Sequence, residues 1–376
     1  MLTIETSDGT EYKAFTAVSA SKSLDTGSGT FSFTATVNEN NAFPVANGDL
    51  IVVKADGFPI ITGYVDQLQS GYSVDESGNA QHSVNIQGRD KIADIVDSSL
   101  PEAIEIEGNK TLKEIIEIVI KNVGADITVI DLAKPAAFGT GELISSEPAE
   151  NLWEFILKYS RKRSVILVSN GDGNIVITQT PEEPIATVLL AEKGNPNNNI
   201  KSASVRYADQ ERFNRYVYIS QGSGVSANFF GQTSTEDISD RNGEFKDSAI
   251  RASRVWCEEA ETSMDKTQCI DRATWQANIR KAKAREYSCN VFGHSHLTGA
   301  WTVGLQIIVS DDLLNISEKD RLLSKSVTWD YNEQSGSTSS ITLTDKNAYS
   351  LEVEEENRLA NAAKQKGTGG IPVWQL

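Results

Sequence analysis

The sequence predicts a mainly β protein of several domains, in which two similar small β-barrel domains accompany an α+β insert and further α/β elements. Short stretches with strand-like alternation, separated by turn residues, fill both ends of the chain. Two stretches with helical spacing lie between them, and residues 48–56 resemble residues 304–312. The length of 376 residues also exceeds what one ordinary core supports, which favours about two to four domains.

The N-terminal region, residues 1–97, is predicted to form the first β-barrel. Phe31, Phe33, Ala35 and Val37 alternate with Ser and Thr, the period of a half-buried strand. Further strand patterns follow at 50–53, 60–61, 63–69 and 82–88, with turns at 56–57 and 75–79. Short strands interrupted this often indicate a small antiparallel barrel or sandwich.

Residues 98–180 are predicted to form the α+β insert. A first helix has five apolar residues at helical spacing, with Thr111 placed to cap its start and Gly124 to end it: Leu112, Ile115, Ile116, Val119 and Val123. A second helix is expected from about 148 to 163, with Pro148 in its first turn. Segments 164–169 and 174–179 flank an Asn-Gly-Asp-Gly turn and predict a hairpin.

The C-terminal half repeats the mixture of strands and helices. Strands are expected at 200–207, 215–220, 289–292, 301–309, 322–330 and 339–344, and helices at about 265–287 and 350–366. Residues 221–248 are rich in Gly, Ser and Asp and predict a long loop. The expected domains are a second β-barrel from 181–220 with 288–348, a loop and long-helix domain over 221–287, and a C-terminal helix and tail over 349–376.

The similarity between residues 48–56 and 304–312 continues along the chain beyond both segments. A strand, a Gly/Ser-rich loop and a polar-apolar strand come next in both places, at 83–86 in one and 340–343 in the other. The repeat predicts two β domains with the same strand order.

The charge and the cysteines limit the possible partners and the compartment. Lys and Arg number 35 against 52 Asp and Glu, a formal net charge of −17, which opposes binding to nucleic acid or anionic membranes. The N-terminal segment has no signal-peptide pattern, and no apolar run is as long as a membrane span. Cys257, Cys269 and Cys289 form no CxxC pair and indicate reduced thiols in a protein made in the cytoplasm.

The sequence offers no clear catalytic, cofactor or metal site, so none of the three is predicted. His294 and His296 would share one face of a strand, but His82 is the one further histidine and no Cys/His cluster completes a set of ligands. The GxSxG, HExxH and Walker patterns are absent. Carboxylate pairs such as Asp311 and Asp312 are expected by chance among 52 acids, although a glycosidase-type pair distant in sequence stays open.

Two groups of basic residues are open to two interpretations. Lys158 and residues 161–163 suit the C-terminal dipole of their own helix better than a nucleic-acid surface. A second group lies on the long helix, where it either contacts an acidic surface of another subunit or is simply solvated: Arg272, Arg280, Lys281, Lys283 and Arg285.

Several segments, in the same order along nearly the whole chain, resemble the Mu-like phage baseplate hub proteins, which are relatives of the T-even hub and of the hub region of type VI secretion spikes. The segments are GFPIITGYV (57–65), IQGRDKIADIVD (86–97), LWEF (152–155), the hairpin at 165–177, RATW (272–275), TVG (302–304) and LTDKNAY (343–349). The resemblance is weakest at 221–254 and over about the last twenty residues.

The resemblance implies a structural, non-enzymatic virion protein: a homotrimer in which two similar barrels per chain give six quasi-equivalent units. Such a ring would match a sixfold contractile tail tube on one face and a threefold central spike on the other. The implied partners are copies of the chain itself, the spike, the tube and other baseplate proteins, without nucleic acid or stable membrane insertion. The implied location is the tail baseplate of a phage or Mu-like prophage, after assembly in the host cytoplasm.

Two alternatives remain. A hub of a type VI secretion or tailocin-like machine would use the same architecture, although the long C-terminal β-helical spike of fused secretion proteins is not expected here. A carbohydrate-active enzyme on a β scaffold would need exposed aromatic residues along a cleft, which an aromatic content of 7% does not favour. The Gly-rich, apolar segment 367–376 is expected to dock on a subunit of the trimer or to anchor the spike through Trp374.

Overall fold

The computed structural model describes residues 1–345, except 14, 38–44, 75–77, 79, 141–143, 164, 180, 182, 220–241, 260–265, 318–320 and 335. The expected C-terminal helix at 350–366, the tail segment 367–376 and most of the 221–248 loop therefore lie outside the described residues. The described chain is mainly β with several domains, which confirms the predicted fold class. No helix in the described residues is long and apolar enough to span a membrane.

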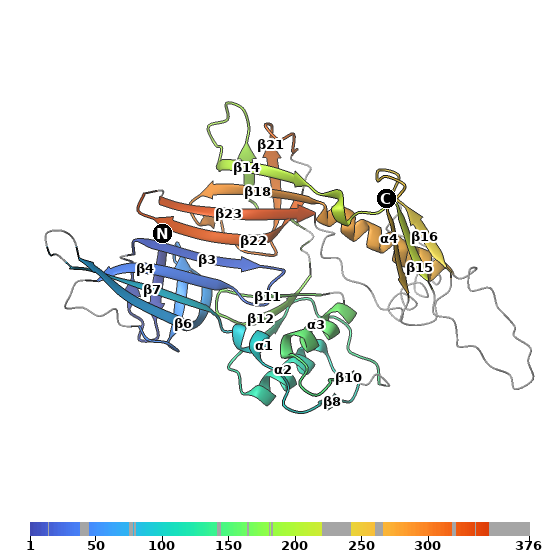
Figure 1. Ribbon diagram of the computed structural model, residues 1–376, viewed down its shortest axis with the longest axis horizontal. Coiled ribbons are helices and arrows are strands. Elements are labelled where there is room, and N and C mark those ends of the chain that lie inside the picture. Colours follow the sequence, from blue (N-terminus) through green and yellow to red (C-terminus); the bar gives the residue numbers. More distant parts are fainter. Residues whose placement is uncertain are drawn as a thin grey trace, which may run out of the picture. The chain divides into compact units, whose positions relative to one another are not determined.

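The first β domain is fully antiparallel. Its strands are β1 (Leu2–Thr6), β2 (Glu11–Tyr12), β3 (Ala17–Ser23), β4 (Thr30–Val37), β5 (Leu50–Ala55), β6 (Phe58–Val74) and β7 (Ala80–Asp90), in the order β3-β4-β7-β6-β5-β1-β2. The alternation expected around Phe31 and Phe33 forms β4, where both rings are buried. β6 and β7 continue together as a long two-stranded arm (Figure 1).

The α+β domain has one core that extends from Ile92 to Ile177. Its elements are α1 (Ala93–Asp97), β8 (Glu105–Ile106), α2 (Leu112–Val123), β9 (Val129–Asp131), β10 (Ile144–Ser145), α3 (Leu152–Lys162), β11 (Ile166–Ser169) and β12 (Ile175–Thr178). The predicted cap of α2 is confirmed: Thr111 and Glu114 form a capping box, and Gly124 ends the helix at φ 71°. The predicted hairpin is confirmed as β11 and β12.

The start of α3 differs from the prediction. The helix begins at Leu152 and not at Pro148, because the Asn151 side chain accepts a hydrogen bond from the Glu154 N–H (3.1 Å) and so caps the helix there. Ala149, immediately upstream, has φ 60°, which is incompatible with a right-handed helix through this position.

The second β domain repeats the strand order of the first. Its strands are β13 (Val188–Ala191), β14 (Ile200–Tyr207), β18 (Arg285–Phe292), β21 (Gln306–Asp311), β22 (Arg321–Asn332) and β23 (Gly336–Asp345), with a small hairpin of β19 (Ser295–His296) and β20 (Gly299–Ala300). The order β14-β18-β23-β22-β21-β13 corresponds to β3-β4-β7-β6-β5-β1. The domains differ in two respects. β13 pairs with β21 in parallel, whereas β1 pairs with β5 antiparallel, and β2 of the first domain has no counterpart beside β13 among the described residues. The predicted common strand order is confirmed.

The two β domains are open sheets and not closed barrels. β22 pairs antiparallel with β3, so the strands of both domains join in one 13-stranded sheet (Figure 1). The expectation of separate barrels fails on this point because β3, the edge strand of the first domain, pairs with the part of β22 that β21 does not cover. Sequence alternation shows which residues face the core, but not which edge a strand pairs with.

A small domain forms a separate compact unit within Ser204–Tyr287. It contains η1 (Asp209–Glu211), β15 (Arg215–Ile219), β16 (Gly243–Lys246), β17 (Val255–Glu259) and α4 (Lys266–Lys283), with sheet order β16-β15-β17. The strand expected at 215–220 therefore belongs to this sheet. The long helix ends at Lys283 and not at Tyr287, because Tyr287 is a fully buried residue of β18.

Candidate assembly surfaces

The junction of β22 and β3 holds the two β domains together. Seven residue pairs lie opposite each other, from Ser326 and Ser23 to Asn332 and Ala17. Trp329 is fully buried opposite Ala20, and the Ser19 hydroxyl donates to Asp330 Oδ1 at 2.7 Å. A shallow hollow of about 250 Å³ lies along this junction and β4. The junction shows how one β domain of this type recognises the next.

A buried polar cluster fixes the α+β domain to the first β domain. Lys22, on β3, is 4% exposed and donates from Nζ to the carbonyl oxygens of Ser169 (3.1 Å) and Asn170 (2.8 Å). Asp90, 1% exposed, accepts from the N–H groups of Gly29 (2.8 Å) and Ile92 (3.1 Å) and from the Ser169 hydroxyl (2.7 Å). This cluster was not predicted from the sequence, since an isolated Lys among Ser and Ala residues gives no signal of burial.

Burial dominates the titration of both charged groups in this cluster. It lowers the pKa of Lys22 to about 8, against the opposing attraction of Asp90 and Asp172. Burial also raises the pKa of Asp90, while the Lys22 charge and the three hydrogen bonds act in the opposite direction. The attraction between the two charges lowers the cost of burying each of them, and both groups contact Ser169 of the α+β domain.

The β11–β12 turn packs closely against the first β domain. The Thr62 hydroxyl donates to the Gly171 carbonyl oxygen at 2.8 Å. A Cβ atom added at Gly171 would lie 2.0 Å from the Pro59 carbonyl oxygen, so a glycine is required by the close approach of two backbones.

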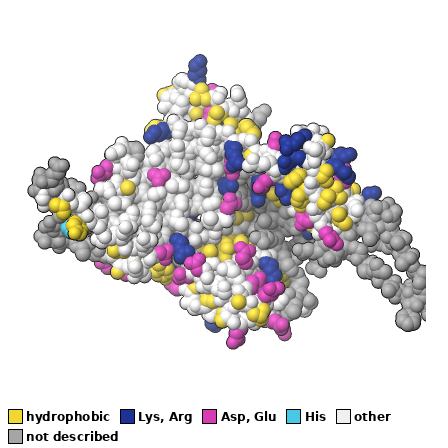
Figure 2. Space-filling model, viewed as in Figure 1, with side chains coloured by type: hydrophobic (Ala, Val, Ile, Leu, Met, Phe, Trp, Pro, Cys, Tyr) yellow, Lys and Arg dark blue, Asp and Glu magenta, His cyan; other side chains and the backbone are white. Residues whose placement is uncertain are grey.

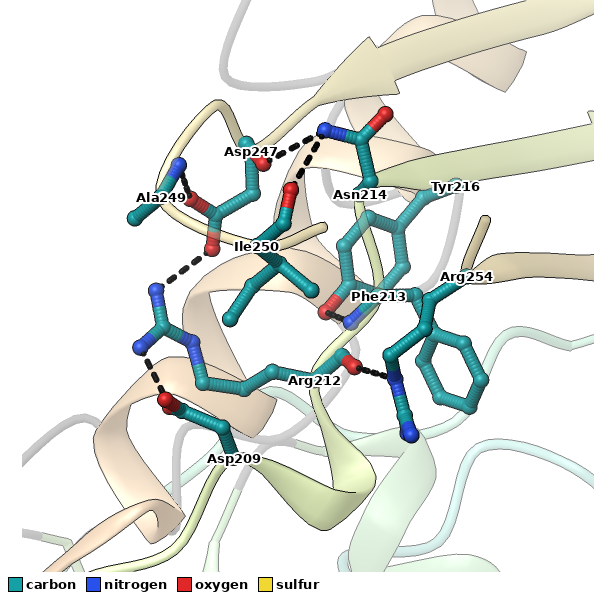
Figure 3. A network of polar contacts seen from close by, with 9 residues as sticks. All are labelled: Asp209, Arg212, Phe213, Asn214, Tyr216, Asp247, Ala249, Ile250 and Arg254. Carbon is teal, nitrogen blue, oxygen red and sulfur yellow. Dashed lines mark hydrogen bonds and ion pairs between the residues drawn. The ribbon is translucent and has the colours of Figure 1, made fainter. Parts of the chain in front are cut away.

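The small domain contains a network of charged groups around the start of β15 (Figure 3). Arg212 joins Asp209 (2.7 Å) and Asp247 (2.6 Å), and its carbonyl oxygen accepts from Arg254 Nε at 2.7 Å. Asn214 Nδ2 donates to the carbonyl oxygens of Asp247 (3.0 Å) and Ile250 (2.9 Å). These contacts hold the turn after β16 against the start of β15.

The basic residues near α4 differ in their surroundings. The Arg280 guanidinium lies over the rings of Phe213 (5.4 Å) and Trp256 (5.1 Å), so it stabilises the domain rather than facing solvent alone. Lys281 and Arg285 line a cleft of about 660 Å³ with Asp209, Arg212, Tyr207 and Asp345, among others. Tyr207 is the single aromatic residue in that lining, and the charges of both signs make it a polar surface.

The two histidines of the HxH pattern have different environments. His294 is fully buried, with Nδ1 3.2 Å from the Ser339 hydroxyl, and burial lowers its pKa to about 4. The His296 ring packs 5.1 Å from the Trp301 ring. No group of three or more His, Cys, Asp or Glu residues able to hold a metal occurs in the part of the chain that the structure describes. Burial also raises the pKa of the Cys289 thiol to about 12, which keeps it protonated.

Apolar side chains are exposed on two strand edges of the described sheet. Tyr72 and Val74, near the end of β6, are 73% and 57% exposed, and Tyr207, at the end of β14, is 67% exposed. Figure 2 shows hydrophobic side chains gathered on the projecting arm of β6 and β7. Exposed apolar residues on a strand edge indicate a surface that a partner covers.

Comparison with known proteins finds similarity to phage baseplate proteins. A family model described as Mu phage baseplate assembly protein GpP-like, N-terminal, matches residues 3–90, and the model Baseplate hub protein gp44-like, second domain, matches residues 92–179. The baseplate hub protein gp44 of Escherichia phage Mu is 22% identical over 370 residues, which cover 97% of this chain and 92% of that protein.

Solved structures share the fold. The 43 kDa tail protein of prophage MuSo2 from Shewanella oneidensis superposes with a TM-score of 0.73 at 23% identity, over 92% of this chain and 98% of that one. A component of the E. coli type VI secretion system, described as similar to the T4 tail proteins gp27 and gp5, gives 0.54 at 10% identity, over 93% and 79% of the two chains. These matches confirm the resemblance that the sequence predicts.

Proposed function

We propose, on the premise that this chain is a Mu-like phage tail baseplate hub protein, that three copies form a ring that adapts the sixfold tail tube to the threefold central spike. The observation that supports the adaptor is the common strand order of the two β domains. Three chains with two such domains each place six similar β domains around a threefold axis, so one ring can present sixfold and threefold surfaces.

We infer a structural role without catalysis. The charged clusters of the described residues hold elements together: Lys22 and Asp90 join two domains, and Arg212 joins two segments of the small domain. A carbohydrate-active enzyme would be expected to line a cleft with aromatic rings, whereas the larger described cleft has Tyr207 alone. The proposed location is the virion tail baseplate, after assembly in the host cytoplasm.

The mass of the purified protein in solution tests the ring. Light scattering at micromolar concentration is expected to give three times the 41.0 kDa chain mass. Each contact between subunits is expected to bury about 2,000 Å² or more, the size of a permanent interface. A monomer would refute the trimeric hub. Pull-down with purified tail tube and with spike protein then tests the two faces separately, and a trimer that binds neither would refute the adaptor.

The segment 367–376 is proposed to bind the spike or a neighbouring subunit. A chain ending at residue 366 separates these possibilities in the same two assays. An intact trimer without spike binding supports the anchor, an altered mass assigns the segment to the subunit contact, and unchanged behaviour in both assays excludes both roles.

A hub of a type VI secretion or tailocin-like machine is the second candidate, and the fold similarity to the E. coli secretion component favours it. Tube proteins from the two classes of machine distinguish the candidates. Binding to a phage-type tube but not to a secretion-type tube supports the phage tail hub, and the reverse result supports the secretion machine.

A further inference from the structure

Two stretches of strand in the 13-stranded sheet have a strand partner on one side alone among the described residues. The first is β14, the end strand of the sheet, which pairs with β18. The second is the part of β6 that extends past β5: β5 pairs with β6 as far as Tyr64, so that residues 67–74 of β6 pair with β7 alone. We call residues 67–74 the β6 edge and residues 200–207 the β14 edge. Long strand edges that carry exposed apolar side chains are templates for pairing with another chain.

The β6 edge is the counterpart of the part of β22 that pairs with β3. In the first domain the Gly48 N–H donates to the Val65 carbonyl and the Val65 N–H to the Asp49 carbonyl. In the second domain the Gly304 N–H donates to Ser324, and the Ser324 N–H to Leu305. Val65 therefore corresponds to Ser324, a difference of 259 in number, and residues 67–73 correspond to residues 326–332, all of which face β3.

The β14 edge is in turn the counterpart of β3. The side-chain contact of Thr34 with Asn85 corresponds to that of Ser288 with Thr342, which aligns β18 with β4. Opposite Ser32 on β4 lies Ser19. The counterpart of Ser32, Glu286, forms an ion pair with Arg206, and the hydrogen bond from Asn290 to Ser202 four residues along each strand agrees with the same antiparallel register. Ser19 thus corresponds to Arg206, a difference of 187, and Val18 corresponds to Val205.

We propose, building on the trimeric ring of the proposed function, that the β14 edge of one copy pairs antiparallel with the β6 edge of the next copy in the register of the β22–β3 junction. Tyr331 lies opposite Val18 within the chain. Applying the two differences places Tyr72 opposite Val205 of the next copy, Ser70 opposite Tyr207 and Val74 opposite Ala203. Each copy uses two different edges, which makes the contact heterologous and able to close a ring.

Two observations independent of the strand order support this register. First, both pairs consist of a Tyr and a Val: Tyr331 lies opposite Val18 within the chain, and Tyr72 would lie opposite Val205 of the next copy. The residues brought together are also those that the single chain leaves exposed: Tyr72 at 73%, Tyr207 at 67% and Val74 at 57%, whereas Val18 at the internal junction is 2% exposed. Pairing of the two edges would cover all three.

Disulfide cross-linking tests the pairing and its register. Residues directly opposite in an antiparallel pair have Cα atoms about 4.5–5.5 Å apart, within the range a disulfide needs. Chains carrying Tyr72→Cys and chains carrying Val205→Cys, each with the exposed Cys257 replaced by Ser, are mixed and oxidised. The expected product is a covalent dimer in about tenfold higher yield than from Tyr72→Cys with Arg206→Cys, which is one residue out of register and faces the opposite side.

The chain provides its own positive control, because Val18→Cys with Tyr331→Cys should form the same disulfide within one chain. Three outcomes of cross-linking, combined with the mass from light scattering, test the strand pairing between copies. A trimer with the in-register cross-link supports the proposal. A trimer in which the in-register and shifted pairs react equally, while the internal control forms, overturns the pairing and leaves the hub function intact. A monomer overturns the proposed ring and this contact together.

Discussion

Substitution of Asp90 by Ala would remove the negative charge from the connection between the first β domain and the α+β domain. Asp90 accepts three hydrogen bonds at 2.7–3.1 Å and is the principal counter-charge of the buried Lys22. The variant leaves a buried cation without its partner and three donors without an acceptor. Loss of one member of such a buried pair costs about 3–5 kcal/mol in the free energy of unfolding.

The matched control is Asp126→Ala, which removes a carboxylate that is 99% exposed and lies 3.2 Å from Lys91. An exposed ion pair of this kind is worth less than about 1 kcal/mol. Urea denaturation measures the free energy of unfolding of each variant. Hydrogen exchange of the α2 and α3 amides in the folded protein then reports the local stability of the α+β domain. Equal small losses for Asp90→Ala and Asp126→Ala would refute the assignment of the cluster as the connection between the domains.

The same cluster predicts a pH dependence with a definite sign. The folded pKa of Lys22 is about 8, below its usual 10.5, so between these values the unfolded chain binds more protons than the folded one. The contribution of Lys22 to stability should therefore increase from pH 8 to 10.5, by about 3 kcal/mol. The difference in stability between the natural chain and Lys22→Met, measured across this range, should change accordingly, and a constant difference would contradict it.

Three further predictions concern other sites. Burial lowers the pKa of His294 to about 4, so the free energy of unfolding should fall by about 3 kcal/mol as the pH falls from 6.5 to 4. The ring signals of His294 in nuclear magnetic resonance should titrate near pH 4. Gly171→Ala should destabilise the connected domains by about 1–3 kcal/mol because the new Cβ meets the facing backbone, whereas Gly299→Ala, with its nearest neighbour at 3.7 Å, should be nearly neutral in urea denaturation. Arg212→Ala, which removes a 13% exposed side chain from two carboxylates, should cost about 2 kcal/mol, against less than about 1 kcal/mol for the 45% exposed Arg215.

Sequence alone determined the features that depend on neighbours along the chain. The start and end of α2 were predicted from Thr111 and Gly124, because a cap is completed within four residues. The hairpin of β11 and β12 followed from its turn residues. The common strand order of the two β domains followed from the similarity of residues 48–56 and 304–312, since a repeated pattern folds to the same topology.

Tertiary structure decided what depends on contacts between distant residues. Pairing of β22 with β3 turned two expected barrels into one open sheet, and burial of Tyr287 in that sheet ended the long helix early. The Lys22 and Asp90 cluster combines strands, a hairpin and a loop that lie between residues 22 and 170, so no local sequence pattern predicts it. Alternation fixes the face of a strand, whereas the choice of edge partner depends on which other strands of the folded protein lie within reach.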